Sequence, residues 1–96
     1  MAETVYKYLL PGNANEFGEF KVSLPIESKV IHVDIQNGQR VLWAQVNNKA
    51  PLVDRRVVVV GTGRIGPDDL PNLDHVSTFF EGPFVWHVFV GPEDDD

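Results

Sequence analysis

The chain contains no cysteine and only one methionine among its 96 residues. The lack of cysteine excludes a disulfide framework, a thiolate metal site and a cysteine nucleophile, and it fits a reducing compartment. No apolar run approaches the ~20 residues of a membrane-spanning helix, and the first residues do not form a signal peptide. The sequence therefore predicts a soluble intracellular protein.

Basic residues are also scarce. Eight Lys and Arg stand against fourteen Asp and Glu, which gives a formal net charge of −6. This balance argues against a broad surface that follows nucleic-acid phosphates. One small phosphorylated ligand remains compatible with it, because such a contact depends on local geometry. We predict a single β-domain over residues 1–90 and a solvated acidic tail over residues 91–96.

No window of the sequence keeps a helical period for three turns, whereas short runs of strand composition alternate with turn residues. The pattern predicts an all-β fold: a single small antiparallel β-sandwich or barrel of about seven strands. The expected strands are Val5–Leu10, Phe17–Leu24, Lys29–Gln36, Gln39–Val46, Arg55–Gly61, His75–Phe80 and Phe84–Val90.

The Asn37-Gly38 pair predicts a two-residue type I′ hairpin turn, in which both central residues have positive φ. This turn fixes the register of the flanking strands. It places Val33 opposite Leu42 and Ile31 opposite Ala44 on an apolar face, which we expect to form the core. The other face then carries His32 opposite Trp43, Asp34 opposite Val41 and Val30 opposite Gln45.

The segment Val57–Gly66 combines an apolar strand with G-x-G-x-x-G, the spacing of a dinucleotide-binding turn. That turn functions only when it opens a helix that leads to a second parallel strand. Pro67 and Pro71 leave room for at most one short helical turn, and only 30 residues follow Gly66. The sequence therefore argues against the nucleotide-binding fold. Val57–Val60 is apolar on both faces, which indicates a central strand or one covered by a partner.

Two candidate sites follow from these elements. Gly61, Thr62, Gly63 and Arg64 could form an anion nest, with amides turned to one point and Arg64 supplying a planar charge; alternatively the glycines only permit a sharp exit from the strand. For the His32 and Trp43 pair a base-stacking platform is the alternative, and a homo-oligomer interface is the preferred interpretation of the whole second set. Its residues are His32, Trp43, His87 and Phe89.

No cofactor, metal site or catalytic residue is predicted. Asp68, Asp69, Asp74 and His75 are the only clustered hard-metal ligands, and their spacing matches no calcium loop. The three histidines do not belong to a recognisable triad or nucleophile elbow. An enzymatic site could still form from residues that are distant in the sequence.

The order of several motifs resembles a small β-domain family of unknown function found in phage and prophage genomes. The motifs are Tyr6–Tyr8, Gln36–Gly38 followed by Val41–Val46, Arg55-Arg56 before Gly61–Gly63, Ser77–Phe79 and Phe84–Phe89. In that family histidine often follows the Gly-Thr-Gly, where this chain has Arg64. The difference argues against an obligatory catalytic group at this position.

The resemblance implies a phage-encoded, non-enzymatic binding protein that acts in the host cytoplasm. It would antagonise host defence by sequestering a nucleotide signal or by blocking a host protein. Its expected partners are further copies of itself and either a small phosphorylated ligand or a host protein. A virion or assembly accessory domain is the first alternative function, and a small hydrolase or lyase is the second.

Overall fold

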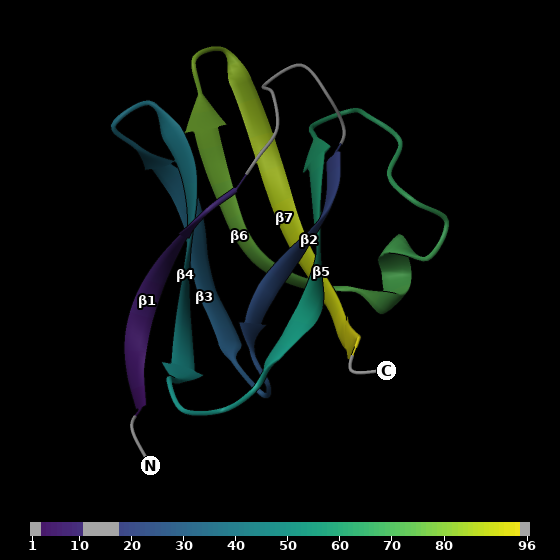
Figure 1. Cartoon of the computed structure of the whole chain (residues 1–96). Helices are drawn as coiled ribbons and strands as arrows, with labels where there is room; N and C mark the ends of the chain where they lie inside the picture. Colours follow the sequence, from purple (N-terminus) through teal and green to yellow (C-terminus); the bar gives the residue numbers. More distant parts are fainter. Residues whose placement is uncertain (1–2, 11–17, 95–96) are drawn as a thin grey trace.

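A computed structural model describes residues 3–10 and 18–94 (Figure 1). The expected strand start at Phe17 lies outside these residues. All seven predicted strands are confirmed. The described residues also contain one 3₁₀ turn. The elements are β1 (Glu3–Leu9), β2 (Gly18–Pro25), β3 (Lys29–Gln36), β4 (Gln39–Asn47), β5 (Leu52–Gly61), η1 (Leu70–Asn72), β6 (Asp74–Glu81) and β7 (Phe84–Asp94).

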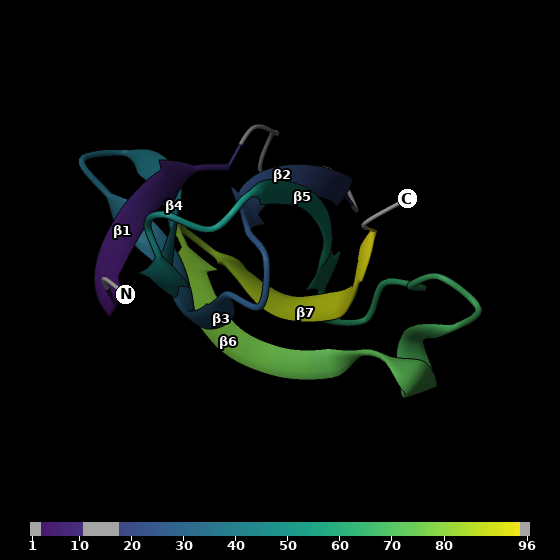
Figure 2. The same ribbon diagram turned by 60° about the horizontal axis from the view of Figure 1, so that its bottom comes forward.

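The strands form two antiparallel sheets. The first has three strands in the order β1-β4-β3, and the second has four in the order β2-β5-β7-β6. Figure 2 shows the two sheets curving around a common interior. Every strand pair is antiparallel, and the described residues after Gly63 include no α-helix. The prediction that the glycine motif does not belong to a nucleotide-binding fold is thereby confirmed.

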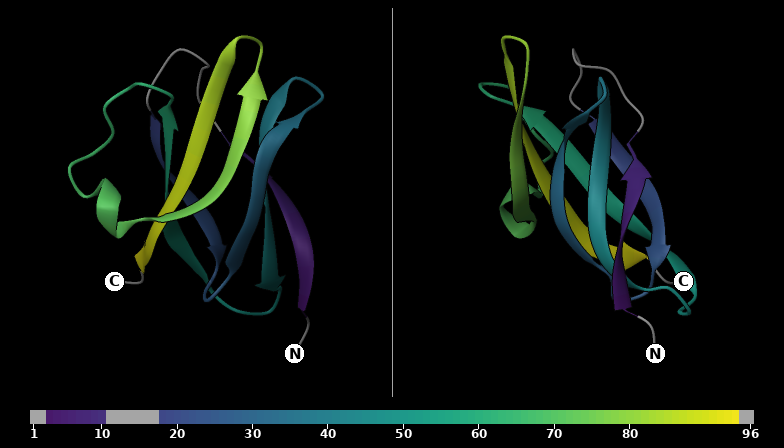
Figure 3. Two further views of the ribbon diagram at one scale, coloured as in Figure 1. Left: turned by 180° about the vertical axis from the view of Figure 1, so that it is seen from behind. Right: turned by 90° about the vertical axis from the view of Figure 1, so that its left-hand side faces the viewer.

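The two sheets meet where β3 runs beside β6, and we call this contact the seam. The hydroxyl of Ser77 on β6 donates a 2.7 Å hydrogen bond to the carbonyl of Val33 on β3. Ser77 Oγ also lies 2.9 Å from Nδ1 of His32. Side-chain bonds therefore hold the sheets together here, and the view from behind in Figure 3 shows β6 and β3 side by side.

The hairpin turn between β3 and β4 has the predicted backbone, with φ of 53° at Asn37 and 76° at Gly38. The predicted register holds from the turn back to His32, which faces Trp43. It is wrong beyond that point. A β-bulge between Val30 and His32 places Val30 opposite Ala44, so Val30 enters the core while Ile31 is 41% exposed. The extra residue moves the side chains that precede it in the chain, Val30 and Lys29, to the faces opposite to those predicted.

The core lies between the sheets, and β5 is central in the four-stranded one. Its four valines, Val57–Val60, are all buried. The outer face of β5 is covered by the chain itself, because a Cβ placed on Gly66 would lie 3.2 Å from Cγ2 of Val60 and 3.1 Å from Leu70. This supports the central-strand interpretation of the valine run. The core residues are Leu10, Val22, Leu24, Val30, Val33, Leu42, Ala44, Val46, Val57, Val59, Phe79, Trp86, Val88 and Val90.

Strands β5 and β7 extend furthest beyond their predicted ends. β5 begins at Leu52, where it pairs with Pro25 of β2. β7 continues past Val90 to Asp94, so residues 91–94, which were expected to begin the acidic tail, belong to this strand. Ladder pairing explains the extension, since Glu93 lies opposite Arg55 and its carboxylate accepts a 2.7 Å hydrogen bond from the amide of Glu27.

Candidate functional site

The corner at the end of β5 is a tight turn. The amide of Thr62 donates a 3.0 Å hydrogen bond to the carbonyl of Val85, and the amide of Arg64 donates one of 3.0 Å to the carbonyl of Gly61. Gly63 has a φ of 81°, which favours glycine at this point. Two of the amides that the nest interpretation directs at an anion are thus already bonded within the protein. The charged donor of this corner is the guanidinium of Arg64.

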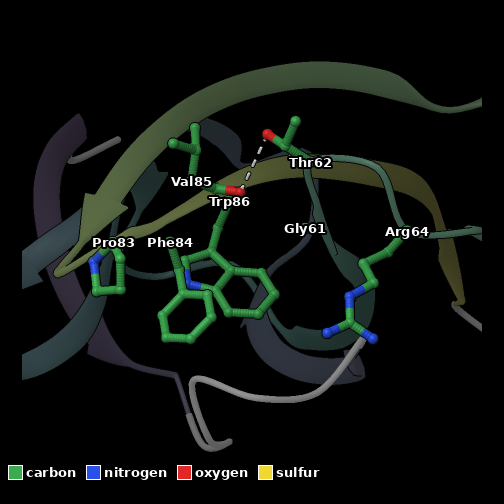
Figure 4. A pocket seen from close by; sticks show the side chains of 7 residues that line it. All are labelled: Gly61, Thr62, Arg64, Pro83, Phe84, Val85 and Trp86. Atoms are coloured by element: carbon green, nitrogen blue, oxygen red, sulfur yellow. Dashed lines mark hydrogen bonds between the residues drawn. The ribbon is translucent and has the colours of Figure 1, made fainter.

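A cavity of about 250 Å³ opens beside this corner (Figure 4). Two aromatic side chains form its wall, with the ring centroids of Phe84 and Trp86 separated by 5.9 Å and the planes inclined by 31°. Trp86 is only 4% exposed, whereas Phe84 is 40% exposed and stands at the mouth. The lining residues are Gly61, Thr62, Arg64, Pro83, Phe84, Val85 and Trp86.

Gly61 has a specific part in forming this cavity. It lies opposite Trp86 in the β5–β7 ladder. A Cβ at this position would come within 2.9 Å of Cζ3 of Trp86 and 3.3 Å of Cγ of Arg64. The first distance is shorter than atoms tolerate, so only glycine leaves the indole in this place.

The two neighbouring arginines differ in their contacts. Arg56 forms a bidentate pair with Asp69, with Nη2 to Oδ1 at 3.1 Å, and a 2.8 Å hydrogen bond to Glu19. These bonds raise the pKa of Arg56, and those from Arg56 lower the pKa of Asp69. Among the described residues, the side chain of Arg64 has no hydrogen-bond or ion-pair partner. Asp69 is thus neutralised by Arg56 and does not compete for Arg64.

Trp86 is held in place by an ion pair between a buried arginine and a partly buried glutamate. Glu81 Oε1 accepts a 3.2 Å hydrogen bond from the indole nitrogen of Trp86 and a 3.1 Å hydrogen bond from Nη2 of Arg40. The guanidinium carbon of Arg40 lies 5.0 Å from the Trp86 ring centroid and 5.5 Å from that of Phe79. This support fixes the orientation of the cavity wall, a rigidity that favours selective binding.

A second polar cluster crosses the outer face of the four-stranded sheet. Thr62 Oγ1 lies 2.8 Å from Nε2 of His87, whose Nδ1 lies 3.0 Å from Oγ1 of Thr78. The same Thr78 hydroxyl lies 2.9 Å from Nε2 of His75, and the His75 ring meets Phe89 edge-on at 5.3 Å. His75 and His87 are thus brought together, with ring centroids 6.5 Å apart.

The candidate metal ligands considered from the sequence do not converge. Asp69 turns to Arg56 and His75 turns to Thr78. Within residues 3–10 and 18–94, no three His, Asp or Glu side chains are grouped so that they could hold a metal ion.

The third histidine lies at the seam, within a Ser–His–Asp series that sequence spacing does not reveal. His32 contacts Ser77 through Nδ1 at 2.9 Å and Asp34 through Nε2 at 3.3 Å. Ser77 is 5% exposed and its hydroxyl already donates to the carbonyl of Val33. A buried hydroxyl that already donates its hydrogen bond is poorly placed to attack a substrate. The contact between Ser77 and His32 therefore links the two sheets.

The four predicted interface residues fall into two separate groups. His32 and Trp43 stack on the three-stranded sheet, with ring centroids 6.0 Å apart. His87 and Phe89 lie on β7 of the other sheet, next to His75. The role of both groups as an interface stays a prediction.

The sequence indicates Gly61–Arg64 as a candidate site but does not join Phe84 and Trp86 to it. The alternation of these two aromatic residues along the last strand shows that they share a face. Their position beside Gly61 depends on the β5–β7 register, in which Gly61 faces Trp86 from a distant part of the chain. Arg40 and Glu81 were missed for the same reason, since 41 positions separate them.

The described residues contain no helix with the length and apolar character needed to cross a bilayer. No curated protein and no solved structure matches the chain significantly. One family model does match it, over residues 1–96, in agreement with the resemblance to a β-domain of unknown function. The chain belongs to the family described as "Domain of unknown function (DUF7352)".

Proposed function

We propose that this protein is a non-enzymatic binding module that holds a small phosphorylated ligand with a planar base, a mononucleotide or cyclic nucleotide, in the cavity beside Gly61. One observation carries the proposal: the side chain of Arg64, without a partner in the described part of the chain, stands at a cavity whose wall is Phe84 and Trp86. A charged planar donor and an aromatic wall are the two groups that a nucleotide requires.

The chemistry of each group supports this ligand class. A guanidinium binds a phosphate through two parallel hydrogen bonds, and an aromatic face contributes about 1–3 kcal/mol for each stacked base. The cavity of about 250 Å³ is small, since pockets for drug-sized ligands typically hold roughly 300–1,000 Å³. A single nucleotide fits this scale better than a dinucleotide.

The biological setting extends the proposal. The resemblance to phage and prophage domains supports a phage-encoded protein that acts in the host cytoplasm. There it would sequester a nucleotide signal and so antagonise host defence. Sequestration needs tight binding without turnover, and Arg64 is accordingly assigned a binding role in this proposal.

Isothermal titration calorimetry with AMP, GMP and 3′,5′-cyclic AMP tests the ligand class. We expect binding of at least one of these nucleotides. Arg64→Ala should weaken it by about 1.5–3 kcal/mol, the range for a hydrogen bond to a charged group, with little change in the melting temperature of the free protein. Phe84→Ala should weaken it as well, because the exposed ring contributes the outer part of the wall.

Lys49→Ala is the matched control, since it removes one exposed positive charge from the loop between β4 and β5. It should leave the affinity unchanged. An affinity that is equal in wild type and Arg64→Ala would refute the proposed site. Failure of all three nucleotides to bind would refute the ligand class and favour a host protein as the target.

A further inference from the structure

Strand β1 is an edge of the three-stranded sheet, and among the described strands it pairs only with β4. In Figure 1 it lies at the lower left of the molecule, and the right-hand view of Figure 3 turns that side toward the viewer. Three of its seven residues are large exposed hydrophobic side chains: Val5 at 50%, Tyr6 at 45% and Leu9 at 61%. A strand edge of this kind offers unpaired backbone groups to another strand.

The other edges of the two sheets are less suited to strand addition. β3 is covered at the seam by β6. In β2 the exposed polar residues Glu19, Lys21 and Ser23 alternate with less exposed ones. This strand ends at Pro25, which lacks an amide donor. β1 contains neither proline nor glycine. The free and regular edge of the described structure is therefore β1.

We propose that a second copy of this chain pairs with β1 in an antiparallel arrangement, with Val5 on the two-fold axis. The sequence of β1 is complementary to itself in this register. Glu3 of one copy lies opposite Lys7 of the other, and this charge pair occurs twice. Val5 meets Val5, and Thr4 meets Tyr6. Opposite charges and apolar pairs that face each other across strands stabilise a sheet.

Neighbouring registers that keep the same faces together lose this complementarity. With Tyr6 on the axis, Lys7 lies opposite Val5 and Glu3 opposite Leu9, so both charges face apolar side chains. With Lys7 on the axis, the two lysines face each other. Only the register centred on Val5 pairs both charged residues, and charge therefore selects one alignment.

Both charges are available for this contact. The Glu3 carboxylate accepts a 3.3 Å hydrogen bond from the Gln45 amide, and the Lys7 ammonium donates a 2.9 Å hydrogen bond to the Gln36 amide oxygen. These partners are neutral, and neither charge forms an ion pair within the described residues. The resulting dimer has a continuous six-stranded sheet in the order β3-β4-β1-β1-β4-β3, and its interface is isologous.

Sedimentation equilibrium over micromolar to submillimolar protein concentrations tests the pairing. Wild type should dimerise. Lys7→Glu brings two carboxylates together at each of the two charged contacts, and Glu3→Lys brings two ammonium groups together there. Each single variant should therefore dimerise about tenfold more weakly or worse, since attraction becomes repulsion at two positions.

Two recombinations of these charges are decisive. The double variant Glu3→Lys/Lys7→Glu restores opposite charges and should dimerise like wild type. A mixture of the two single variants should form a heterodimer, because both of its charge pairs are then attractive. Lys49→Glu makes the same change of charge away from the edge and should have no effect. Circular dichroism verifies that each variant is folded.

A monomeric wild type at submillimolar concentration would overturn the proposal. So would a dimer that Lys7→Glu leaves intact. A dimer that survives Lys7→Glu but dissociates in Trp43→Ala would place the interface on the His32 and Trp43 group instead.

Discussion

Arg40 and Glu81 form an ion pair beneath the cavity wall, with Nη2 and Oε1 3.1 Å apart. The arginine side chain is 4% exposed and the glutamate side chain 27%. Nη1 of Arg40 is buried and has no hydrogen-bond partner in the described structure. The positive charge of Arg40 is therefore stabilised by the carboxylate of Glu81 and by the ring faces of Trp86 and Phe79.

Removal of Glu81 should be strongly destabilising. Glu81→Ala leaves the buried guanidinium without a counter-charge, and the loss of one partner from a buried pair costs about 3–5 kcal/mol. Urea unfolding measures the change in free energy. Glu81→Gln keeps a hydrogen-bond acceptor and should cost less. Equal stability of wild type and Glu81→Ala would show that Arg40 does not need this partner.

The hairpin turn should depend on the positive φ at Gly38. A Cβ there meets no atom within 4 Å, so Gly38→Ala tests backbone strain without a steric clash. We expect a loss of about 1 kcal/mol, measured by thermal or urea unfolding. Gly38→Asn should lose less, because asparagine enters this conformation more readily than alanine. An alanine variant as stable as wild type would contradict the assigned turn.

Stability should fall at acidic pH through Asp69. The hydrogen bonds from Arg56 hold the pKa of Asp69 below its usual value. Their contribution is therefore present above the unfolded-state pKa of about 4 and is lost as the pH falls through the lower folded-state pKa. The difference in unfolding free energy between wild type and Asp69→Asn should be constant near neutrality and shrink in acid.

Asp68→Asn is the control for that pH series, because Asp68 is exposed and next in sequence. Its difference from wild type should stay small at every pH. If the Asp69→Asn difference did not change between neutral and acidic pH, the pair with Arg56 would not be the source of the acid sensitivity.

Gly61→Ala should disturb the cavity wall. The new methyl group meets Trp86 Cζ3 at 2.9 Å in the present geometry, so the indole must move. Overpacking of this kind typically costs about 1–3 kcal/mol. Near-ultraviolet circular dichroism should change with the environment of the indole, and any nucleotide affinity should fall. Gly63→Ala places its methyl group in open space and adds only the strain of its positive φ, so it should change the Trp86 signal less than Gly61→Ala does.

The strands and the Asn37-Gly38 turn could be predicted from the sequence because they depend on local composition and periodicity. The bulge at Ile31 could not, since apolar side chains at Val30 and Ile31 are equally consistent with a regular strand. The buried position of Arg40 depends on Glu81, which is distant in the chain. The glycine corner was predicted as a site, but its amide bonds depend on Val85 of another strand.

The order of strands in the two sheets also determines how the chain can fold. The chain enters the three-stranded sheet with β1, leaves it for β2, returns for β3 and β4, and leaves again at β5. Neither sheet is therefore a continuous stretch of sequence, and the described strands alternate between the sheets three times. Closing the loops between such distant strands costs conformational entropy before the stabilising contacts form. Folding is therefore expected to be slow and highly cooperative. No single cut in the chain would separate one sheet from the other.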